Sequence, residues 1–210
     1  MNKKSQKLAL GGVMIALATI LSLITIYSLP YGGSITLLSM LPLLFVGFIY
    51  GKAWGVLTGV IYGILQAILG AATSSAFAGL DFVSVMLVII LDYLVAFGVL
   101  GFAGIFKNKI KNIPLSFGLG VFLSTTLRYI THFISGYIVY GSYAEWFFSQ
   151  ETVSYGEKIM SEYSGKMLAA VYSLIYNATF MIPEIILSVI AGILIVNIPG
   201  IKEICKRGSL

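Results

Sequence analysis

The chain has 210 residues, of which 59% are hydrophobic and only 10% are charged, and its mean hydropathy is +0.99. A soluble domain carries about 25% charged residues, so this composition excludes an ordinary water-soluble protein. The formal net charge is +5, and the single cysteine, Cys205, excludes an internal disulfide and a cysteine-cluster metal site.

Six apolar stretches predict an all-α integral membrane protein with six transmembrane helices in one domain, residues 1–210. The first follows a lysine-containing start that resembles a signal peptide, but it is long enough to span and no small-residue cleavage site follows it. We therefore expect it to be retained. Pro42 is expected to kink the second stretch, and Pro114 suits the first turn of the fifth. The approximate spans are 8–27, 35–50, 53–69, 82–106, 115–140 and 166–197, with a polar loop over 141–165.

The basic residues predict the orientation of these spans. On one side of the expected membrane lie ten of them: Lys3, Lys4, Lys7, Lys52, Lys107, Lys109, Lys111, Lys202, Lys206 and Arg207. The loops on the other side hold only Lys158 and Lys166, together with most of the carboxylates. Because short basic loops stay cytoplasmic, both termini are expected inside the cell. The positive charge is thus a topology signal, and nucleic-acid binding is not expected.

Four ionisable side chains remain inside the expected spans: Asp92, Arg128, His132 and Glu184. Arg128 and His132 are spaced i and i+4, so a helix places them on one face. An arginine at the centre of a spanning helix costs roughly 2.5–3.5 kcal/mol, so this face is expected to avoid lipid. One interpretation is structural, with Arg128 in a buried ion pair with Asp92 or Glu184. The other is a binding site or proton relay, and both stay open.

Aromatic and amide side chains accompany these charges on the expected fourth, fifth and sixth helices. Tyr172 and Tyr176 are spaced i and i+4, with Asn177 beside them, although a tyrosine pair at this spacing is more often packing than a binding site. A carboxylate, an imidazole, a carboxamide and several tyrosines together suit a small ligand that has a cationic part and a flat hydrogen-bonding ring. Aromatic faces attract such a cation by about 0.5–2 kcal/mol each. Asp92 would neutralise the cation, and Asn177 and His132 would read the edge of the ring.

Motifs for catalysis are missing from the sequence. It has no His-Glu-x-x-His or Gly-x-Ser-x-Gly, and its one histidine is too few for a typical metal site. Gly165-Lys166 lacks the Ser/Thr and the upstream glycine of a phosphate-binding loop. We therefore expect no catalytic residue, no metal, no cofactor and no ATP hydrolysis by this chain.

Four blocks of the sequence combine these polar and aromatic residues: YGGSIT at 31–36 with Pro42, LDYLVAF at 91–97, LRYITHFISG at 127–136 and YSLIYNAT at 172–179. Together they resemble the thiamine-specific substrate-binding (S) components of energy-coupling factor (ECF) transporters. The resemblance extends from the first helix to Pro183. It implies six helices that bind thiamine near the outer face of the membrane, under the first loop.

Carried over by position, the resemblance implies particular roles for residues of this chain. The implied ligand contacts are Asp92, Tyr93, His132, Tyr140, Tyr172 and Asn177. Tyr140 stands where some members have a tryptophan that stacks on the ligand, and a second such tryptophan aligns near Gly33 and Ser34. On the first helix, Gly12 and Ala16 match the small-xxx-small motif that docks the coupling subunit. Packing within this chain is the alternative interpretation of that motif.

The leading hypothesis is a high-affinity thiamine-capture subunit of an ECF-type importer in the bacterial plasma membrane. It would not be an enzyme, and it would work with a transmembrane coupling (T) component and two cytoplasmic ATPases. The alternative is a self-contained proton-coupled transporter of thiamine or a related vitamin, with Asp92 and His132 as the relay. The lack of an inverted repeat counts against that alternative. A membrane scaffold or intramembrane enzyme is the third class, and it predicts tolerance of Asn177→Ala.

Overall fold

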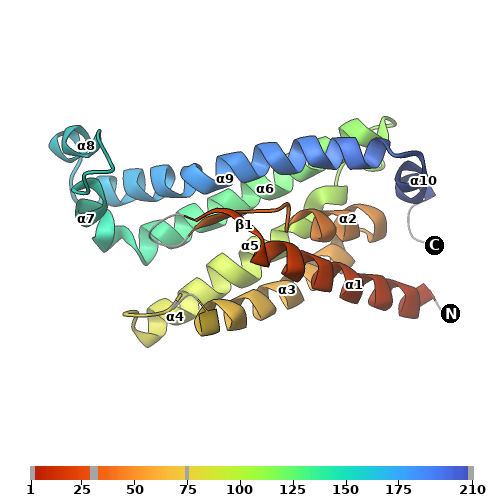
Figure 1. Ribbon diagram of the computed structural model, residues 1–210, viewed down its shortest axis with the longest axis horizontal. Coiled ribbons are helices and arrows are strands. Elements are labelled where there is room, and N and C mark those ends of the chain that lie inside the picture. The colour runs from red at the N-terminus through yellow and green to blue at the C-terminus, as the bar shows by residue number, and fades with distance from the viewer. Residues whose placement is uncertain (1–2, 29–32, 74–75, 208–210) are drawn as a thin grey trace.

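Long apolar helices make up most of the computed structural model, which describes residues 3–28, 33–73 and 76–207 (Figure 1). Within these ranges, five helical stretches are long and apolar enough to cross a membrane. They are α1 (Lys3–Leu23), α3 (Lys52–Thr73), the composite stretch Phe82–Gly104, α6 (Ile113–Ile138) and α9 (Gly165–Asn197). The chain is thus a multi-pass, mainly helical protein.

The second predicted span is the one that the structure changes most. Helix α2 runs only from Leu41 to Tyr50, with Pro42 in its first turn. Residues at the expected start of this span instead form strand β2 (Ser34–Thr36), which pairs antiparallel with β1 (Thr25–Ser28). The all-α prediction is therefore wrong for this hairpin. Ten helical residues rise about 15 Å, half the thickness of a hydrocarbon core of about 30 Å. Tyr31 and Gly32 of the first resemblance block lie outside the described residues.

The fourth stretch is one continuous helix with changing geometry. It consists of α4 (Phe82–Val88), the π-helical η1 (Ile89–Val95), α5 (Ala96–Gly98) and the 3-10 helix η2 (Val99–Gly104). Asp81 caps its start by accepting from the backbone N–H groups of Val83 and Ser84. Hydrogen bonds from Ser84, with its side chain first, lower the pKa of the Asp81 carboxyl. The cap therefore stays ionised, which favours this helix start.

Helices α6 and α9 lie side by side along the length of the molecule (Figure 1). They run antiparallel, because Gly136 meets Ser173 near one end of the pair and Gly118 meets Ile193 near the other. Asn112 caps α6 by accepting from the N–H of Leu115. This pair carries three of the six predicted site residues, His132, Tyr172 and Asn177.

Close packing between α2, α3 and η2 depends on glycine. A Cβ atom added at Gly55 would come within 2.6 Å of the Cα atoms of both Gly47 and Gly101. The backbones of these three elements therefore touch without intervening side chains, as small residues allow in membrane helices. Beside this contact, Phe45 and Phe48 pack on Phe117 of α6, at ring-centroid distances of 4.6 and 4.9 Å.

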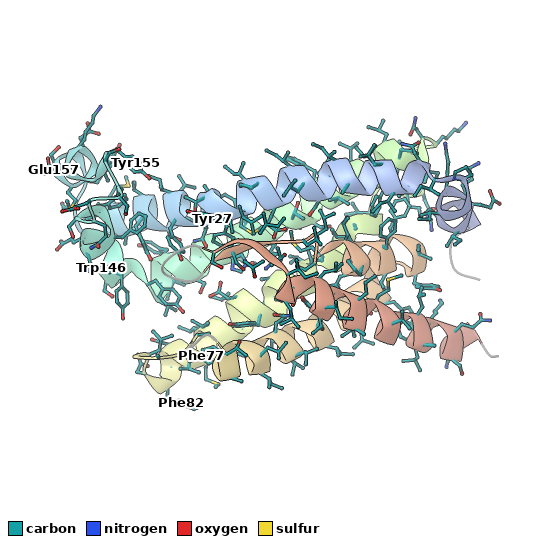
Figure 2. All side chains as sticks on the ribbon, viewed as in Figure 1. Tyr27, Phe77, Phe82, Trp146, Tyr155 and Glu157 are labelled. Carbon is teal, nitrogen blue, oxygen red and sulfur yellow. The ribbon has the colours of Figure 1, made fainter. Side chains whose placement is uncertain are left out.

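The expected polar loop over 141–165 is mostly short helices: η3 (Gly141–Tyr143), α7 (Ala144–Phe148) and α8 (Gly156–Glu162). Trp146 and Tyr155 of this segment lie at the same end of the molecule as Phe77 and Phe82 (Figure 2). The start of α1 and helix α10 (Pro199–Arg207) lie at the opposite end (Figure 1). The beginning and end of the described chain thus share one end of the bundle.

The side of α10 that faces the bundle carries Cys205, the single cysteine of the chain. The structure records it as free and buried, and it packs in the main core cluster beside Ile201. Burial raises the pKa of the Cys205 thiol to about 11. A buried thiol with such a pKa stays protonated and unreactive near neutral pH.

Gly12 and Ala16, the predicted docking pair, both lie on the exposed side of α1. A Cβ at Gly12 would meet no atom within 4 Å, whereas neighbouring Gly11 is buried. Val13 and Ile20, also on α1, are 61% and 59% exposed. Among residues 3–28, 33–73 and 76–207, Gly12 therefore makes no close helix contact of the kind that the alternative interpretation requires.

Candidate functional site

Asp92 lies within the π-helical segment η1, where the helix is wider than an α-helix. Such turns are rare and occur frequently at functional sites. Gly63 of α3 packs so closely here that a Cβ would come within 2.5 Å of the carbonyl oxygen of Tyr93. The carboxylate of Asp92 points to α6, where Oδ1 lies 2.7 Å from His132 Nδ1 and Oδ2 accepts from the Ser135 hydroxyl. Asp92 and His132 thus form a close carboxylate–imidazole pair between η1 and α6.

The two ring nitrogens of His132 have different partners. Arg128 donates through Nε to His132 Nε2 over 3.1 Å, so Nε2 is the acceptor. Nδ1 is then the protonated nitrogen and donates to Asp92. This arrangement requires a neutral imidazole with its proton on Nδ1, because a second ring proton would point at the Arg128 donor. The predicted i, i+4 pair thus forms one hydrogen-bonded chain that ends on a carboxylate.

Arg128 does not form the ion pair that the sequence suggested. Neither Asp92 nor Glu184 lies within ion-pair distance of its guanidinium among the described residues. Its planar group stands 4.3 Å from the ring centroid of Phe97 and bonds to His132. The expected buried pair is therefore wrong: the imidazole separates Arg128 from Asp92, and the Phe97 ring occupies another side of the guanidinium.

Asn177 reaches from α9 to the same part of α6. Its Nδ2 group donates to the backbone carbonyl oxygens of His132 and Ser173, over 3.2 and 2.8 Å, and lies 3.3 Å from the Ser173 hydroxyl. Ser173 in turn donates to the carbonyl of Phe133. Since the amide N–H groups are used in holding the two helices together, Oδ1 is the atom of Asn177 that remains for a ligand donor.

Aromatic side chains form a row from helix α7 to His132. Phe147 and Tyr176 each stand within 5.7 Å of Tyr172, measured between ring centroids. Tyr176 is 6.2 Å from Phe180, and Phe180 is 5.9 Å from His132. This row, defined by Phe147, Tyr172, Tyr176, Phe180 and His132, joins the predicted Tyr172 to the imidazole through residues of α9.

The remaining two predicted residues lie at the margins of this arrangement. Tyr140 packs against the cluster that contains Tyr172 and faces the ring of Tyr143 at 6.4 Å. Burial, and next the nearby charge of Asp92, raise the pKa of the Tyr140 phenol, so it is a neutral donor. Tyr93 points the other way, toward the end of α3, with its ring 5.8 Å from Phe77. The structure thus brings Asp92, His132 and Asn177 into one network and places Tyr93 behind it.

Ser135, Ser173 and Phe180 are the site residues that sequence reasoning missed. Ser135 lies three residues after His132, and Ser173 lies four before Asn177, so helical spacing could have placed both on the site faces. Phe180 gave no signal, since phenylalanine is common throughout the chain. No group of three potential metal-binding side chains occurs among residues 3–28, 33–73 and 76–207.

Comparison with known proteins gives three concordant matches. The family model described as "Thiamine transporter protein (Thia_YuaJ)" matches residues 8–155. A Bacillus subtilis (strain 168) protein named "Thiamine transporter ThiT" is 29% identical over an alignment of 189 residues that covers 85% of this chain and 83% of that protein. The solved structure of ThiT from Listeria monocytogenes superposes with a TM-score of 0.69 at 21% identity, covering 95% of this chain and 98% of that one. At that identity, the structural match supports the fold.

Proposed function

Because the chain belongs to the thiamine transporter protein family, we propose that it captures thiamine at the network of Asp92, His132 and Asn177. The observation that carries the proposal is the Asp92 carboxylate, which is held from two sides and lies at the end of an aromatic row. Thiamine joins a permanently cationic thiazolium ring to a flat aminopyrimidine. These are the two features that the site chemistry suits.

The thiazolium ring would lie where it is attracted by both charge and aromatic faces. Asp92 supplies the countercharge, and its side chain keeps 18% of its surface exposed. Tyr140 and Tyr172 offer π faces close by, and each such contact with a cation is worth about 0.5–2 kcal/mol. A permanent cation needs no hydrogen-bond acceptor, so it gains from the field of Asp92 while His132 and Ser135 keep their bonds.

The aminopyrimidine would be read by Asn177. Its Oδ1 atom can accept from the exocyclic amino group, because Nδ2 is already used. Both nitrogens of His132 are also used, so we propose that His132 chiefly holds Asp92 in place and offers its ring face to the ligand. Tyr93 would support η1 from behind and would not stack on thiamine.

Calorimetric titration of the purified full chain with thiamine tests this proposal. We expect saturable heat with thiamine, and a loss of affinity of about 100-fold for Asp92→Asn, since removing one partner of a desolvated charge pair costs several kcal/mol. Asp81→Asn is the matched control, because Asp81 caps the same helix outside the site. Absence of heat with thiamine, or equal binding by Asp92→Asn, would contradict the assignment.

We further propose that the chain is a substrate-capture subunit of the cell membrane that delivers thiamine through a separate T component and two ATPases. The exposed stripe of Gly12, Val13 and Ala16 on α1 supports a docking surface, because small residues let a second helix approach closely. Gly12→Leu should leave thiamine binding intact and abolish uptake in vesicles reconstituted with the partners. Gly200→Leu is the control, since a Cβ there also meets nothing within 4 Å.

One observation favours the proton-coupled alternative, namely the direct contact of His132 with Asp92. Such a pair could pass a proton. Vesicles that contain this chain alone distinguish the two functions: uptake of thiamine driven by a proton gradient would favour the alternative, whereas binding without uptake would favour the capture subunit.

A further inference from the structure

Three buried polar atoms in the middle of the α6–α9 pair have no hydrogen-bond partner among the described residues. They are Ser124 Oγ on α6 and Glu184 Oε2 and Ser188 Oγ on α9. Ser124 and Ser188 are fully buried, and Glu184 is 4% exposed. A buried polar group without a partner costs about 1–3 kcal/mol, and a charged one costs more, so three of them in one place require an explanation.

The register of the two helices brings these atoms onto two successive turns of the α6–α9 interface. The ring of His132 faces Phe180, and Gly118 faces Ile193. Counting one helical turn inward from the first contact places Arg128 opposite Glu184, and a second turn places Ser124 opposite Ser188. The pairs Arg128–Glu184 and Ser124–Ser188 therefore lie one and two helical turns from the Asp92–His132 network, toward the start of α6.

In this register, Arg128 and Glu184 occupy facing positions on the two helices. No ion pair joins them within the described chain, although each is within electrostatic reach of the other. Glu184 Oε1 is occupied by the backbone N–H of Thr36, over 2.6 Å, and by the Thr36 hydroxyl, over 2.9 Å. Its Oε2 has no hydrogen-bond partner among the described residues, and no ion pair joins it to the guanidinium of Arg128.

Pro183 lies in the same part of α9 as these polar side chains. It stands inside α9, immediately before Glu184. Proline has no N–H group, so the carbonyl of Thr179 loses its helical partner, and a helix commonly bends there.

We propose that ordered water occupies these two turns of the α6–α9 interface and bridges Arg128, Glu184, Ser124 and Ser188. A polar contact that is too long for a direct bond is commonly bridged by water, which needs two to four polar partners. Other occupants fit less well. A sodium ion would be repelled by Arg128, and an anion would be repelled by Glu184. Water can donate to Glu184 and the serines and accept from Arg128.

The bridge gives the binding site a connection to the β-hairpin. The bonded chain runs from Asp92 through His132 to Arg128, across the water to Glu184, and on to Thr36 of β2. Thr36 also bonds to Ser39, which precedes α2. A change in how Asp92 is engaged would therefore alter the anchoring of the strand that follows the first loop. This bridged chain is assigned independently of the ligand's identity.

Whether the unfolding temperature rises or falls in two serine variants tests for the proposed ordered water. Removal of a dry, unpartnered hydroxyl relieves a penalty, so Ser188→Ala and Ser124→Ala would then raise the unfolding temperature. Removal of a hydroxyl that binds ordered water lowers it, and this is the result we expect. Ser5→Ala in the exposed part of α1 controls for the helix preference of alanine. A raised or unchanged unfolding temperature for both buried variants overturns the proposal.

A double-mutant cycle tests the connection to β2. Thr36→Val and His132→Phe are combined, and their effects on the unfolding temperature of the full chain without ligand should deviate from additivity, as expected for members of one network. Thr58→Val with His132→Phe is the control pair, because the Thr58 hydroxyl bonds within α3 to Trp54. Additive effects for Thr36 and His132 would overturn the bridge. Because no thiamine is present, this outcome is separate from the test of thiamine binding.

Discussion

Two halves of the molecule are packed by different means, although the continuous helix Phe82–Gly104 belongs to both. At its η2 end, the backbones of α2, α3 and η2 meet through Gly47, Gly55 and Gly101. At its η1 end, the contacts with α6 are made by Asp92, His132 and Ser135 through hydrogen bonds. The η2 end, here called the glycine half, is held by the fit of its backbones. The η1 end, here called the polar half, adds hydrogen bonds to its own close contact at Gly63.

The difference matters for a protein that must bind and release a ligand. Backbone-to-backbone packing has no alternative arrangement of similar energy, so the glycine half is suited to hold its shape. Hydrogen-bonded side chains can exchange one partner for another, including a ligand or water. We infer that the glycine half fixes the position of η1, while the polar half is the part that responds to thiamine.

The strongest way to break the polar half is His132→Phe. This change keeps a ring of similar size but leaves Asp92 without its main partner and Arg128 without its acceptor. Uncompensated buried charge is strongly destabilising, so we expect a loss of about 3 kcal/mol, which lowers the unfolding temperature by roughly 6–12 °C. Thermal unfolding followed by circular dichroism measures it. His132→Gln, which keeps a donor and an acceptor, should recover part of the loss, and equal losses for both variants would contradict the hydrogen-bonding role.

A single added methyl group should destabilise the glycine half. In Gly55→Ala, the new Cβ would lie 2.6 Å from two Cα atoms that cannot move aside. Overpacking of this kind costs about 1–3 kcal/mol. Gly12→Ala is the matched control, since its Cβ meets nothing, and a slight gain in stability is expected there. Equal unfolding temperatures for the two variants would show that the glycine contact is not tight.

Asn177→Ala should weaken thiamine binding without loss of the fold. Removal of the amide takes away the proposed acceptor Oδ1 and loosens the contact between α9 and the His132 carbonyl. A lost ligand hydrogen bond of about 1.4 kcal/mol corresponds to tenfold weaker affinity. Asn197→Ala is the control, because Asn197 makes the same bond to the carbonyl four residues earlier, at the other end of α9. Unchanged affinity in Asn177→Ala would favour the scaffold interpretation.

The sequence predicted what local patterns can determine. Hydropathy located all five long apolar stretches, and the i, i+4 spacing paired Arg128 with His132, as the structure has them. The resemblance to a thiamine-specific family is confirmed by the family match. The cytoplasmic position of the termini and the ligand roles of the six site residues stay predictions.

Features that depend on distant segments could not be predicted. Helix α2 begins at Leu41 because Ile35 and Thr36 pair with β1, which hydropathy does not record. Charge alone makes Arg128 a candidate partner of Asp92, whereas the register between η1 and α6 brings the imidazole of His132 closer. The π-helical geometry of η1 also had no sequence signal. It occurs where Gly63 of α3 approaches Tyr93, a contact between segments that are distant in the chain.

Ser135→Ala is the mildest change to the polar half, and it separates two possible effects of one hydroxyl. The Ser135 hydroxyl donates to Asp92 Oδ2, so it both fixes the carboxylate and partly neutralises it. Holding the Asp92 carboxylate in place favours ligand binding, whereas weakening its negative charge opposes it. Thiazolium is attracted by the charge of Asp92 and does not compete for the hydroxyl's hydrogen bond, so we expect the positioning of the carboxylate to dominate.

Loss of a hydrogen bond worth about 1 kcal/mol in Ser135→Ala then gives roughly fivefold weaker thiamine affinity by calorimetry. Ser161→Ala, whose hydroxyl bonds only to the Lys158 carbonyl in α8, should leave affinity unchanged. Tighter binding by Ser135→Ala would mean that the hydroxyl competes with the ligand and that the polar half is less pre-organised than its contacts indicate.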